Sequence, residues 1–302
     1  MTTQMPCRVA VIGLGSMGYG IASTARRAGF TVVGCDVNPA TTQRFIDEGG
    51  MGAATPADAT QQADIVISVV VNAAQTEAIL FGPTGVAQTM PEGSVFISCA
   101  TMAPEIARAL ATKLEATSRL YLDAPISGGS VRAASGELTV LASGSAASFA
   151  RARPILDKIA IKTYELGDEP GLGAAFKMVN QLLAGVHIVA ACEAITFAAR
   201  QGLDLAKVYE VISAAAGSSW MFENRVPHIL AGDYTPHSSI EIFVKDLGII
   251  EDMARASRFP TPLAAAALQM FLASSGAGMG QDDDASVARL YAQISGTTLP
   301  ST

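Results

Sequence analysis

One short segment restricts the fold of this chain more than any other. Residues 8–12, RVAVI, are apolar and rich in β-branched side chains, which is typical of a buried parallel strand. The turn GLGSMG (13–18) follows, then a helical run to Ala28, then a strand-like run at 31–35 that ends before Asp36. This order of strand, GxGxxG turn, helix, strand and acid predicts a βαβ unit that binds a dinucleotide.

The residues of this turn have separate tasks in such a unit. Gly13 allows the tight turn, Gly15 lets the backbone approach a pyrophosphate, and Gly18 lets the helix pack against the strand. The helix start offers free N–H groups and the positive end of its dipole to phosphates. A glycine-rich turn without a ligand is the alternative. The predicted cofactor contacts here are Gly13, Leu14, Gly15, Ser16, Met17, Gly18 and Asp36.

Asp36 also bears on the choice of cofactor. Its carboxylate can accept hydrogen bonds from both adenosine ribose hydroxyls, and it would repel a 2′-phosphate. No Arg follows in residues 37–39. The sequence therefore predicts NAD rather than NADP.

Strand-like and helical runs continue to alternate after Asp36. The predicted strands are 64–71, 94–98, 120–123 and 138–143, and the predicted helices are 39–48, 74–81, 103–116 and 148–155. Ligands of open parallel sheets lie beyond the carboxyl ends of the strands. Val71, Asn72 and Thr101 are therefore predicted cofactor contacts, with ordinary turn or N-cap chemistry as the alternative for Asn72 and Thr101.

Two further segments suggest where a substrate binds. The backbone N–H groups of Ser127, Gly128 and Gly129 can converge on an anion such as a carboxylate, although a plain tight turn is the alternative. After the turn-rich residues 167–171, residues 171–202 read as one long helix, apolar nearly all round and so expected to be buried on most faces.

That helix carries Lys177. A lysine buried there is a candidate base, because burial lowers the pKa of an ammonium; the alternative is a side chain that snorkels to water. Asn180 and Gln181 share its face of the helix. The turn at 167–171 marks our predicted boundary between domain 1–167 and a mainly helical domain 168–302. In the second domain we expect a helix over 240–257, with 245–246 as a solvated charge pair.

Composition excludes several classes of protein. The formal net charge of the 302 residues is 20 − 27 = −7, which argues against a nucleic-acid partner. Four scattered cysteines and three histidines predict a reducing compartment and no metal site. No uninterrupted apolar run reaches about 18 residues, so we expect a cytoplasmic protein without a membrane partner.

Four motifs now stand in order along the chain: GLGSMG at 13–18, DAPISGG at 123–129, GLGAAFKMVNQ at 171–181 and FVKD at 243–246. Together they resemble the β-hydroxyacid dehydrogenase family. The resemblance implies an α/β Rossmann domain, a long interdomain helix, and an all-α domain that also forms the interface of a homodimer or homotetramer.

The resemblance also implies roles for individual residues. Lys177 would be the general acid/base of a nicotinamide-dependent reaction on a small anionic hydroxy acid, with Asn180 assisting. Ser127, Gly128 and Gly129 would hold the substrate carboxylate, and Lys245 would lie at the closed cofactor–substrate cleft. Some members have Asn four residues after the lysine, where this chain has Gln181. Either amide, Asn180 or Gln181, is therefore a candidate substrate contact.

A finer resemblance concerns the substrate. The segments PISGGSVRAASGELTVLASG, SSWMFENR and GDYTP resemble the sugar-acid branch of the family. That resemblance implies oxidation of the hydroxyl next to the carboxylate of a four-carbon acid, with L-threonate preferred and 2-oxo-tetronate as product. The alternatives are a 3-hydroxyisobutyrate or tartronate semialdehyde dehydrogenase and a non-catalytic dinucleotide-binding sensor. An imine reductase, in which an Asp commonly replaces the lysine, is disfavoured by Lys177.

Overall fold

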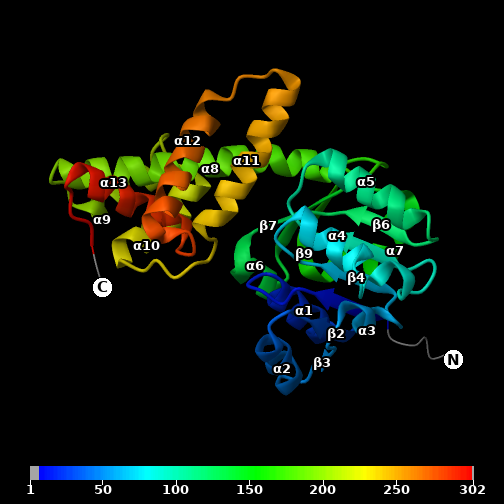
Figure 1. Cartoon of the computed structure of the whole chain (residues 1–302). Coiled ribbons are helices and arrows are strands. Elements are labelled where there is room, and N and C mark those ends of the chain that lie inside the picture. The colour runs from blue at the N-terminus through cyan, green and yellow to red at the C-terminus, as the bar shows by residue number, and fades with distance from the viewer. Residues whose placement is uncertain (1–6, 301–302) are drawn as a thin grey trace. The chain divides into compact units, whose positions relative to one another are not determined.

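The computed structural model describes residues 7–300. They fall into two compact units, one up to Lys177 and one from Met178. The division lies inside a single continuous helix, α8 (Leu172–Arg200), drawn in green in Figure 1. The predicted long helix is thus present, and the boundary that we expected at residue 167 lies ten residues before this division.

A six-stranded parallel sheet forms the centre of the first unit. Its strand order is β3-β2-β1-β4-β5-β6, with the order reversing between β1 and β4, as in doubly wound dinucleotide-binding folds. The strands are β1 (Arg8–Ile12), β2 (Thr31–Cys35), β3 (Met51–Gly52), β4 (Ile65–Ser68), β5 (Val95–Ser98) and β6 (Leu120–Asp123).

Helices connect these strands and cover both faces of the sheet. Successive residues of β1 point into different cores: Val11 packs with Ile21 of the first helix, and Ala10 lies in the core that contains Leu110. The helices are α1 (Gly18–Arg27), α2 (Pro39–Asp47), α3 (Pro56–Thr60), α4 (Ala73–Phe81), the 3₁₀ turn η1 (Val86–Gln88), α5 (Pro104–Glu115), α6 (Gly129–Ser135) and α7 (Ala146–Ile159).

The fourth strand is shorter than its apolar run. We expected a strand over 64–71, but β4 pairs only over Ile65–Ser68. Its neighbour β1 ends at Ile12, where the chain enters the glycine turn, so residues 69–71 have no strand of equal length beside them. The shorter strand exposes Val71 beyond the carboxyl edge of the sheet.

A small second sheet leads from β6 toward α8. It contains β7 (Ile126–Ser127), β8 (Leu138–Ala142) and β9 (Ala160–Glu165), in that order. An isolated bridge between Asp123 and Ser143 ties the end of β6 to the end of β8. This sheet therefore lies directly before the segment that enters the long helix.

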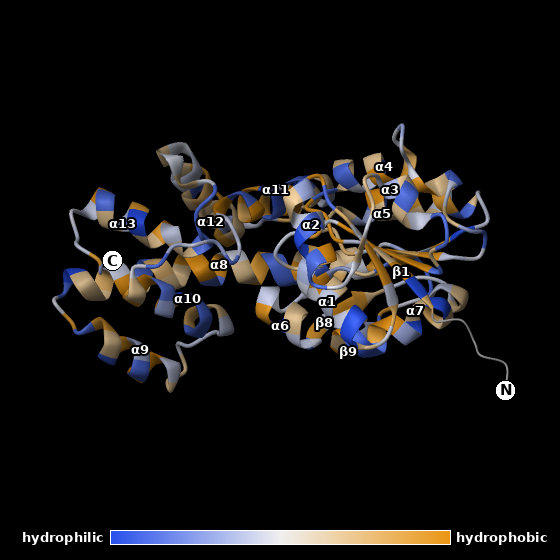
Figure 2. Cartoon of the chain, turned by 90° about the horizontal axis from the view of Figure 1, so that it is seen from below, coloured by the Kyte–Doolittle hydropathy of each residue, from blue (hydrophilic) through white to orange (hydrophobic). Residues whose placement is uncertain are grey.

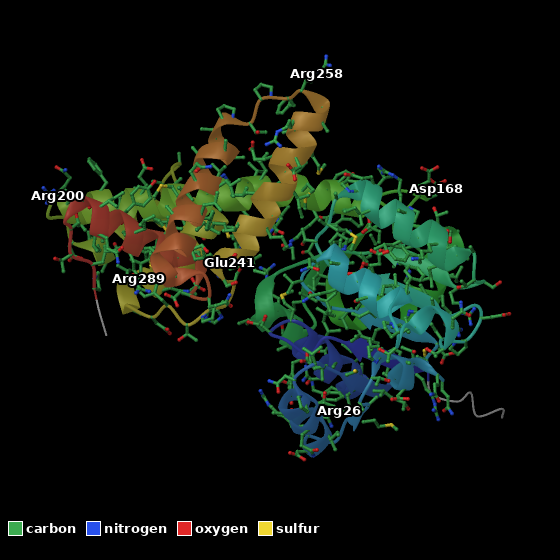
Figure 3. All side chains as sticks on the ribbon, viewed as in Figure 1. Arg26, Asp168, Arg200, Glu241, Arg258 and Arg289 are labelled. Atoms are coloured by element: carbon green, nitrogen blue, oxygen red, sulfur yellow. The ribbon has the colours of Figure 1, made fainter. Side chains whose placement is uncertain are left out.

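The second unit is helical, as predicted. Its elements after α8 are α9 (Leu205–Ser213), α10 (Trp220–Ala231), α11 (Ile240–Ser257), α12 (Pro262–Ser274), the π-helical turn η2 (Ser275–Met279), the 3₁₀ turn η3 (Asp284–Ser286) and α13 (Val287–Ser295). Figure 3 labels Arg258 at the turn between α11 and α12 and Arg200 at the end of α8. Phe243, Leu247 and Ile250 of α11 pack against Ile188 of α8 in one core.

Helix α8 is less buried than its composition suggested. Phe176, Val179, Leu183 and Phe197 form an exposed apolar row along it, 50–64% exposed each, so burial on most faces is wrong for the single chain. Figure 2 shows the apolar colouring along this helix. By length and composition alone α8 could cross a membrane, but half of its apolar stretch is buried inside the protein, as in a core helix.

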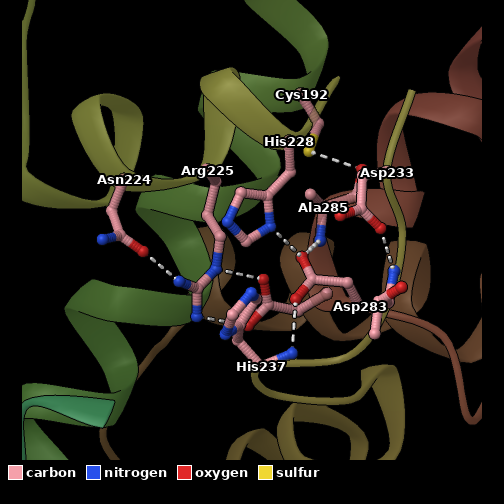
Figure 4. Close-up of polar contacts among 10 residues, drawn as sticks. Cys192, Asn224, Arg225, His228, Asp233, His237, Asp283 and Ala285 are labelled. Atoms are coloured by element: carbon pink, nitrogen blue, oxygen red, sulfur yellow. Dashed lines mark hydrogen bonds and ion pairs between the residues drawn. The ribbon is translucent and has the colours of Figure 1, made fainter. Parts of the chain in front are cut away.

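A buried ion cluster joins α10 to the loop before α13 (Figure 4). The Arg225 guanidinium is paired with both carboxylate oxygens of Asp284, at 3.0 Å from Nη2 to Oδ2. Asp283 accepts hydrogen bonds from the backbone N–H of His237 at 3.0 Å and contacts Nδ1 of His228 at 3.2 Å. Both carboxylates are fully buried. The cluster therefore fixes the C-terminal segment of the helical unit.

Candidate active site

The glycine turn forms a cradle, and each of its three positions, 13, 15 and 18, is a glycine for a different structural reason. A Cβ on Gly13, whose φ is +90°, would lie 2.5 Å from the carbonyl oxygen of Val69, and a Cβ on Gly18 would lie 1.8 Å from that of Gly13. Among the described residues, a Cβ on Gly15 would meet no atom within 4 Å. The protein itself thus requires Gly13 and Gly18, whereas the open space at Gly15 suits the close approach of a ligand such as a pyrophosphate.

Asp36 stands beside this cradle at the end of β2. Its Oδ2 accepts a hydrogen bond of 2.6 Å from the N–H of Leu14, and its Oδ1 accepts one of 2.8 Å from the N–H of Asn38. Each carboxylate oxygen can accept a further bond. Next to the cradle, Ser16 is exposed and Met17 occupies the N-cap position of α1. The arrangement fits an adenosine ribose and the pyrophosphate of a dinucleotide.

The other predicted cofactor contacts also follow parallel strands. Asn72 Oδ1 accepts from the N–H of Gln75 at 2.9 Å and so caps α4, which is the ordinary role we considered for it. Val71 is exposed beside it, and Thr101 follows β5 at the same edge of the sheet. Their contact with a cofactor stays a prediction.

Lys177 is buried beside β7. Its side chain is only 7% exposed, so it does not snorkel to water. Its Nζ donates a hydrogen bond of 2.9 Å to the carbonyl oxygen of Ile126, which directly precedes Ser127. The lysine and the predicted anion-binding loop are therefore neighbours within the first unit.

Asp123 fixes the start of the helix that carries Lys177. Its Oδ2 accepts hydrogen bonds from the backbone N–H groups of Gly171 at 2.9 Å and Ala174 at 2.8 Å, while Ser143 Oγ accepts from that of Gly173. Burial raises the pKa of Asp123 to about 6, opposed by these backbone donors. From the sequence we predicted Asp123 only as the end of a strand, although this residue is the first of the motif DAPISGG.

The loop at 127–129 has the backbone of a tight, glycine-dependent turn. Gly128 and Gly129 have φ values of +135° and +76°, in the region that favours glycine. Strand β7 ends at Ser127 and α6 begins at Gly129. The structure thus explains the two glycines by backbone conformation, and carboxylate binding by this loop stays a prediction.

The second unit holds the remaining predicted residues in one network. Asn180 Nδ2 donates to Gln181 Oε1 at 2.9 Å, and Gln181 Nε2 donates to Asp246 Oδ2 at 2.5 Å. Asp246 Oδ1 accepts from Lys245 Nζ. Asp246 is 1% exposed, so the expected solvated pair at 245–246 is wrong: the acid turns inward from α11 toward α8. Hydrophobic periodicity alone gave no signal for this inward acid.

In the part of the chain that the structure describes, residues 7–300, no group of three or more His, Cys, Asp or Glu side chains is arranged to hold a metal ion. The candidate chemistry of the first unit is carried by Lys177 and by the glycine cradle.

Comparison with known proteins agrees with this geometry. Residues 8–167 match the family model described as the NAD binding domain of 6-phosphogluconate dehydrogenase. Residues 171–291 match the model described as "NAD-binding of NADP-dependent 3-hydroxyisobutyrate dehydrogenase". Fold, cradle and matches together define an NAD(P)-dependent dehydrogenase. More narrowly, the chain belongs to the β-hydroxyacid dehydrogenase family, which includes 3-hydroxyisobutyrate dehydrogenase.

Similar proteins cover the chain almost completely. The L-threonate dehydrogenase of Cupriavidus necator is 51% identical over 96% of this chain and 98% of its own length. That of Escherichia coli is 47% identical over 99% of both. A crystal structure of 3-hydroxyisobutyrate dehydrogenase from Salmonella typhimurium superposes with a TM-score of 0.90 at 47% identity, covering 94% of this chain and 99% of that one. The predicted fold class and family are confirmed.

Proposed function

We propose that this chain oxidises L-threonate to 2-oxo-tetronate (2-dehydro-L-erythronate) with NAD as the hydride acceptor. The observation that carries the chemistry is the buried Lys177, held by the Ile126 carbonyl at 2.9 Å beside the Ser127–Gly129 loop. The choice of acid is supported by relatives named L-threonate dehydrogenase that are 46–51% identical over nearly the whole chain.

Lys177 accepts the substrate proton in this reaction. When bound, the nicotinamide of NAD supplies the acceptor for the hydride that leaves C2 of the acid. The neutral amine of Lys177 takes the hydroxyl proton while the O–H electron pair forms the carbonyl bond. The Ile126 carbonyl can accept an N–H bond from either the amine or the ammonium, so it keeps the side chain aimed in both protonation states.

The surrounding residues bind and orient. The N–H groups of Ser127, Gly128 and Gly129 hold the substrate carboxylate, as the family resemblance implies. Asn180 lies one helical turn after Lys177 and assists at the substrate. Lys245 would contact the substrate and the cofactor, as the family resemblance implies.

NAD is preferred over NADP in this proposal. Asp36 accepts hydrogen bonds from the N–H groups of Leu14 and Asn38, which fix its carboxylate beside the glycine cradle, where we expect the ribose. A 2′-phosphate would bring like charge against it.

A second candidate is 3-hydroxyisobutyrate, because the 3-hydroxyisobutyrate dehydrogenase of Salmonella typhimurium is 47% identical to this chain. Tartronate semialdehyde remains a third acid of the same class. A dinucleotide-binding sensor without turnover is the alternative from another class.

One set of initial rates separates these functions. L-threonate, D-glycerate and 3-hydroxyisobutyrate are each offered with NAD and with NADP, and NADH or NADPH is followed at 340 nm. We expect the highest kcat/KM for L-threonate with NAD. A higher value for another acid would transfer the assignment to it, and NADH binding without any turnover would favour the sensor.

The assembly belongs to the same proposal. The exposed apolar row on α8, Phe176, Val179, Leu183 and Phe197, suits burial against a second copy in a homodimer or homotetramer. We place the enzyme in the cytoplasm, since its four cysteines are free thiols and its substrate is a small metabolite.

A further inference from the structure

We propose that Asp246 is a positioning residue. It fixes the orientation of two amides in series, Gln181 and Asn180, so that Asn180 presents a hydrogen-bond acceptor to a second hydroxyl of the substrate. The inference rests on the proposed function, because it concerns how the same site chooses its acid.

The first step follows from the charge of Asp246. A carboxylate has only acceptor oxygens, so the group 2.5 Å from its Oδ2 must be the N–H donor of Gln181. The other oxygen, Oδ1, is engaged by Lys245. Each oxygen of this buried acid therefore has its own partner, and Gln181 cannot reverse its amide without placing oxygen against oxygen.

The second step passes this orientation along α8. With Nε2 toward Asp246, Gln181 turns Oε1 toward Asn180, whose Nδ2 lies 2.9 Å away and must donate. An isolated side-chain amide can flip its oxygen and nitrogen at little cost. Here the acid at one end decides the orientation of both amides.

The third step concerns what is left for a ligand. Gln181 is 7% exposed and both its polar atoms are used inside the protein, whereas Asn180 is exposed. Within residues 7–300, Asn180 Oδ1 has no side-chain or backbone donor. Asn180, rather than Gln181, is thus the amide that faces a substrate, and the atom it offers is an acceptor.

The chemistry of the acids makes this acceptor selective. L-threonate carries hydroxyl donors beyond the one that is oxidised, and 3-hydroxyisobutyrate carries a methyl group instead. A site that hydrogen-bonds a substrate hydroxyl rejects an analogue that lacks it, because the protein group is left unpaired. The chain of hydrogen bonds from Asp246 through Gln181 to Asn180, which we call the relay, therefore favours polyhydroxy acids.

The test compares L-threonate with its analogue lacking the 3-hydroxyl, 2,4-dihydroxybutyrate of matching configuration at C2. The variants are Gln181→Met, Asp246→Asn and the two combined, with Asp252→Asn as the control, an exposed acid on the same helix. In wild type we expect kcat/KM to favour L-threonate. Either single change should lower that ratio about tenfold, and the double variant should lower it no further, since both act on one relay.

A second measurement separates the relay from Lys245. Gln181→Met keeps the Asp246–Lys245 pair, so it should leave the KM for NAD unchanged, whereas Asp246→Asn should raise it. Because Gln181→Met retains size and burial, it also decides the matter if Asp246→Asn does not fold by circular dichroism.

The outcomes are distinct. An unchanged substrate ratio in Gln181→Met, or losses that add in the double variant, would overturn the relay while the proposed function stands. If wild type oxidises only acids without a second hydroxyl, both the proposed function and this inference fall.

Discussion

The carboxylate of Asp123 lies 2.8 Å from the backbone N–H of Ala174, one turn before Lys177 on the same helix. Three residues after Asp123, the Ile126 carbonyl accepts the hydrogen bond from Lys177 Nζ. One short segment therefore holds both the start of α8 and the end of its lysine. Because an uncapped helix start is mobile, this double attachment restricts where the amine can move.

Replacing Lys177 with Ala tests the assignment of the base. We expect kcat to fall by about 100-fold or more, because no proton acceptor remains at that position. NAD binding, measured by calorimetry, should stay within about twofold. Lys113→Ala, an exposed lysine paired with Glu77, serves as the control and should keep full activity. Retained turnover in Lys177→Ala would remove the lysine from the mechanism.

The glycine cradle offers a matched pair of substitutions. Gly15→Ala places its methyl group in open space, so the melting temperature should hold while the Kd for NAD rises about tenfold or more. Gly18→Ala drives a methyl group against the Gly13 carbonyl and should cost about 2–3 kcal/mol of stability. Thermal unfolding and NAD titration of both variants check this. Equal NAD affinity in Gly15→Ala and wild type would show that no ligand approaches there.

The buried Asp123 makes stability depend on pH. The pKa of Asp123 in the folded chain is raised to about 6. Its contribution to the free energy of unfolding is therefore present at low pH and is lost as pH rises through about 6. Asp123→Asn lacks this titration. The unfolding free energy of wild type minus that of the variant should therefore fall by about 1 kcal/mol from pH 5 to pH 7. Urea unfolding at both pH values measures it, and a difference that rises with pH would contradict the raised pKa.

The Arg225–Asp284 pair supports the helical unit. Arg225→Leu alone leaves a buried carboxylate without its partner and should cost about 3–5 kcal/mol. Replacing both, as Arg225→Met with Asp284→Leu, should recover most of that loss, because no unpaired charge remains. Urea unfolding of the two variants distinguishes them; a double variant less stable than Arg225→Leu would argue against this account.

The apolar row on α8 gives a test of assembly. Leu183→Glu places a charge in the middle of that row and should shift the protein to a smaller species in size-exclusion chromatography with light scattering. Ile46→Glu, on the exposed side of α2, should leave the assembly unchanged. If Leu183→Glu elutes with the mass of wild type, the row is not the interface.

The sequence alone allowed much of the fold to be predicted. The GxGxxG turn and the helix over 240–257 were predicted correctly, because local backbone needs and a 3.6-residue apolar period determine them. The short β4 was not, since its length depends on where its neighbour β1 ends. The length of a strand in a parallel sheet depends on the strand it pairs with, so it cannot be predicted from one run of residues alone.

The candidate site divides in the same way. Lys177 and the glycine loops stand out by residue type and spacing. Asp246 does not stand out, nor does Asp284 of the ion cluster outside the site, because an acid in a helix or a run of acids normally faces water. Their burial arises from partners 65 and 59 residues away, Gln181 and Arg225. Such pairings are visible only once the chain is folded.

Gly15 differs from its two neighbours in the cradle in a way that bears on descent. Gly13 and Gly18 are needed by any chain that keeps this turn, whatever it binds, whereas no atom of residues 7–300 restricts a Cβ at position 15. A duplicated copy that no longer used a dinucleotide would be free to change at 15 while preserving 13 and 18. The side chain at that one position would then separate working descendants from those that have kept only the scaffold.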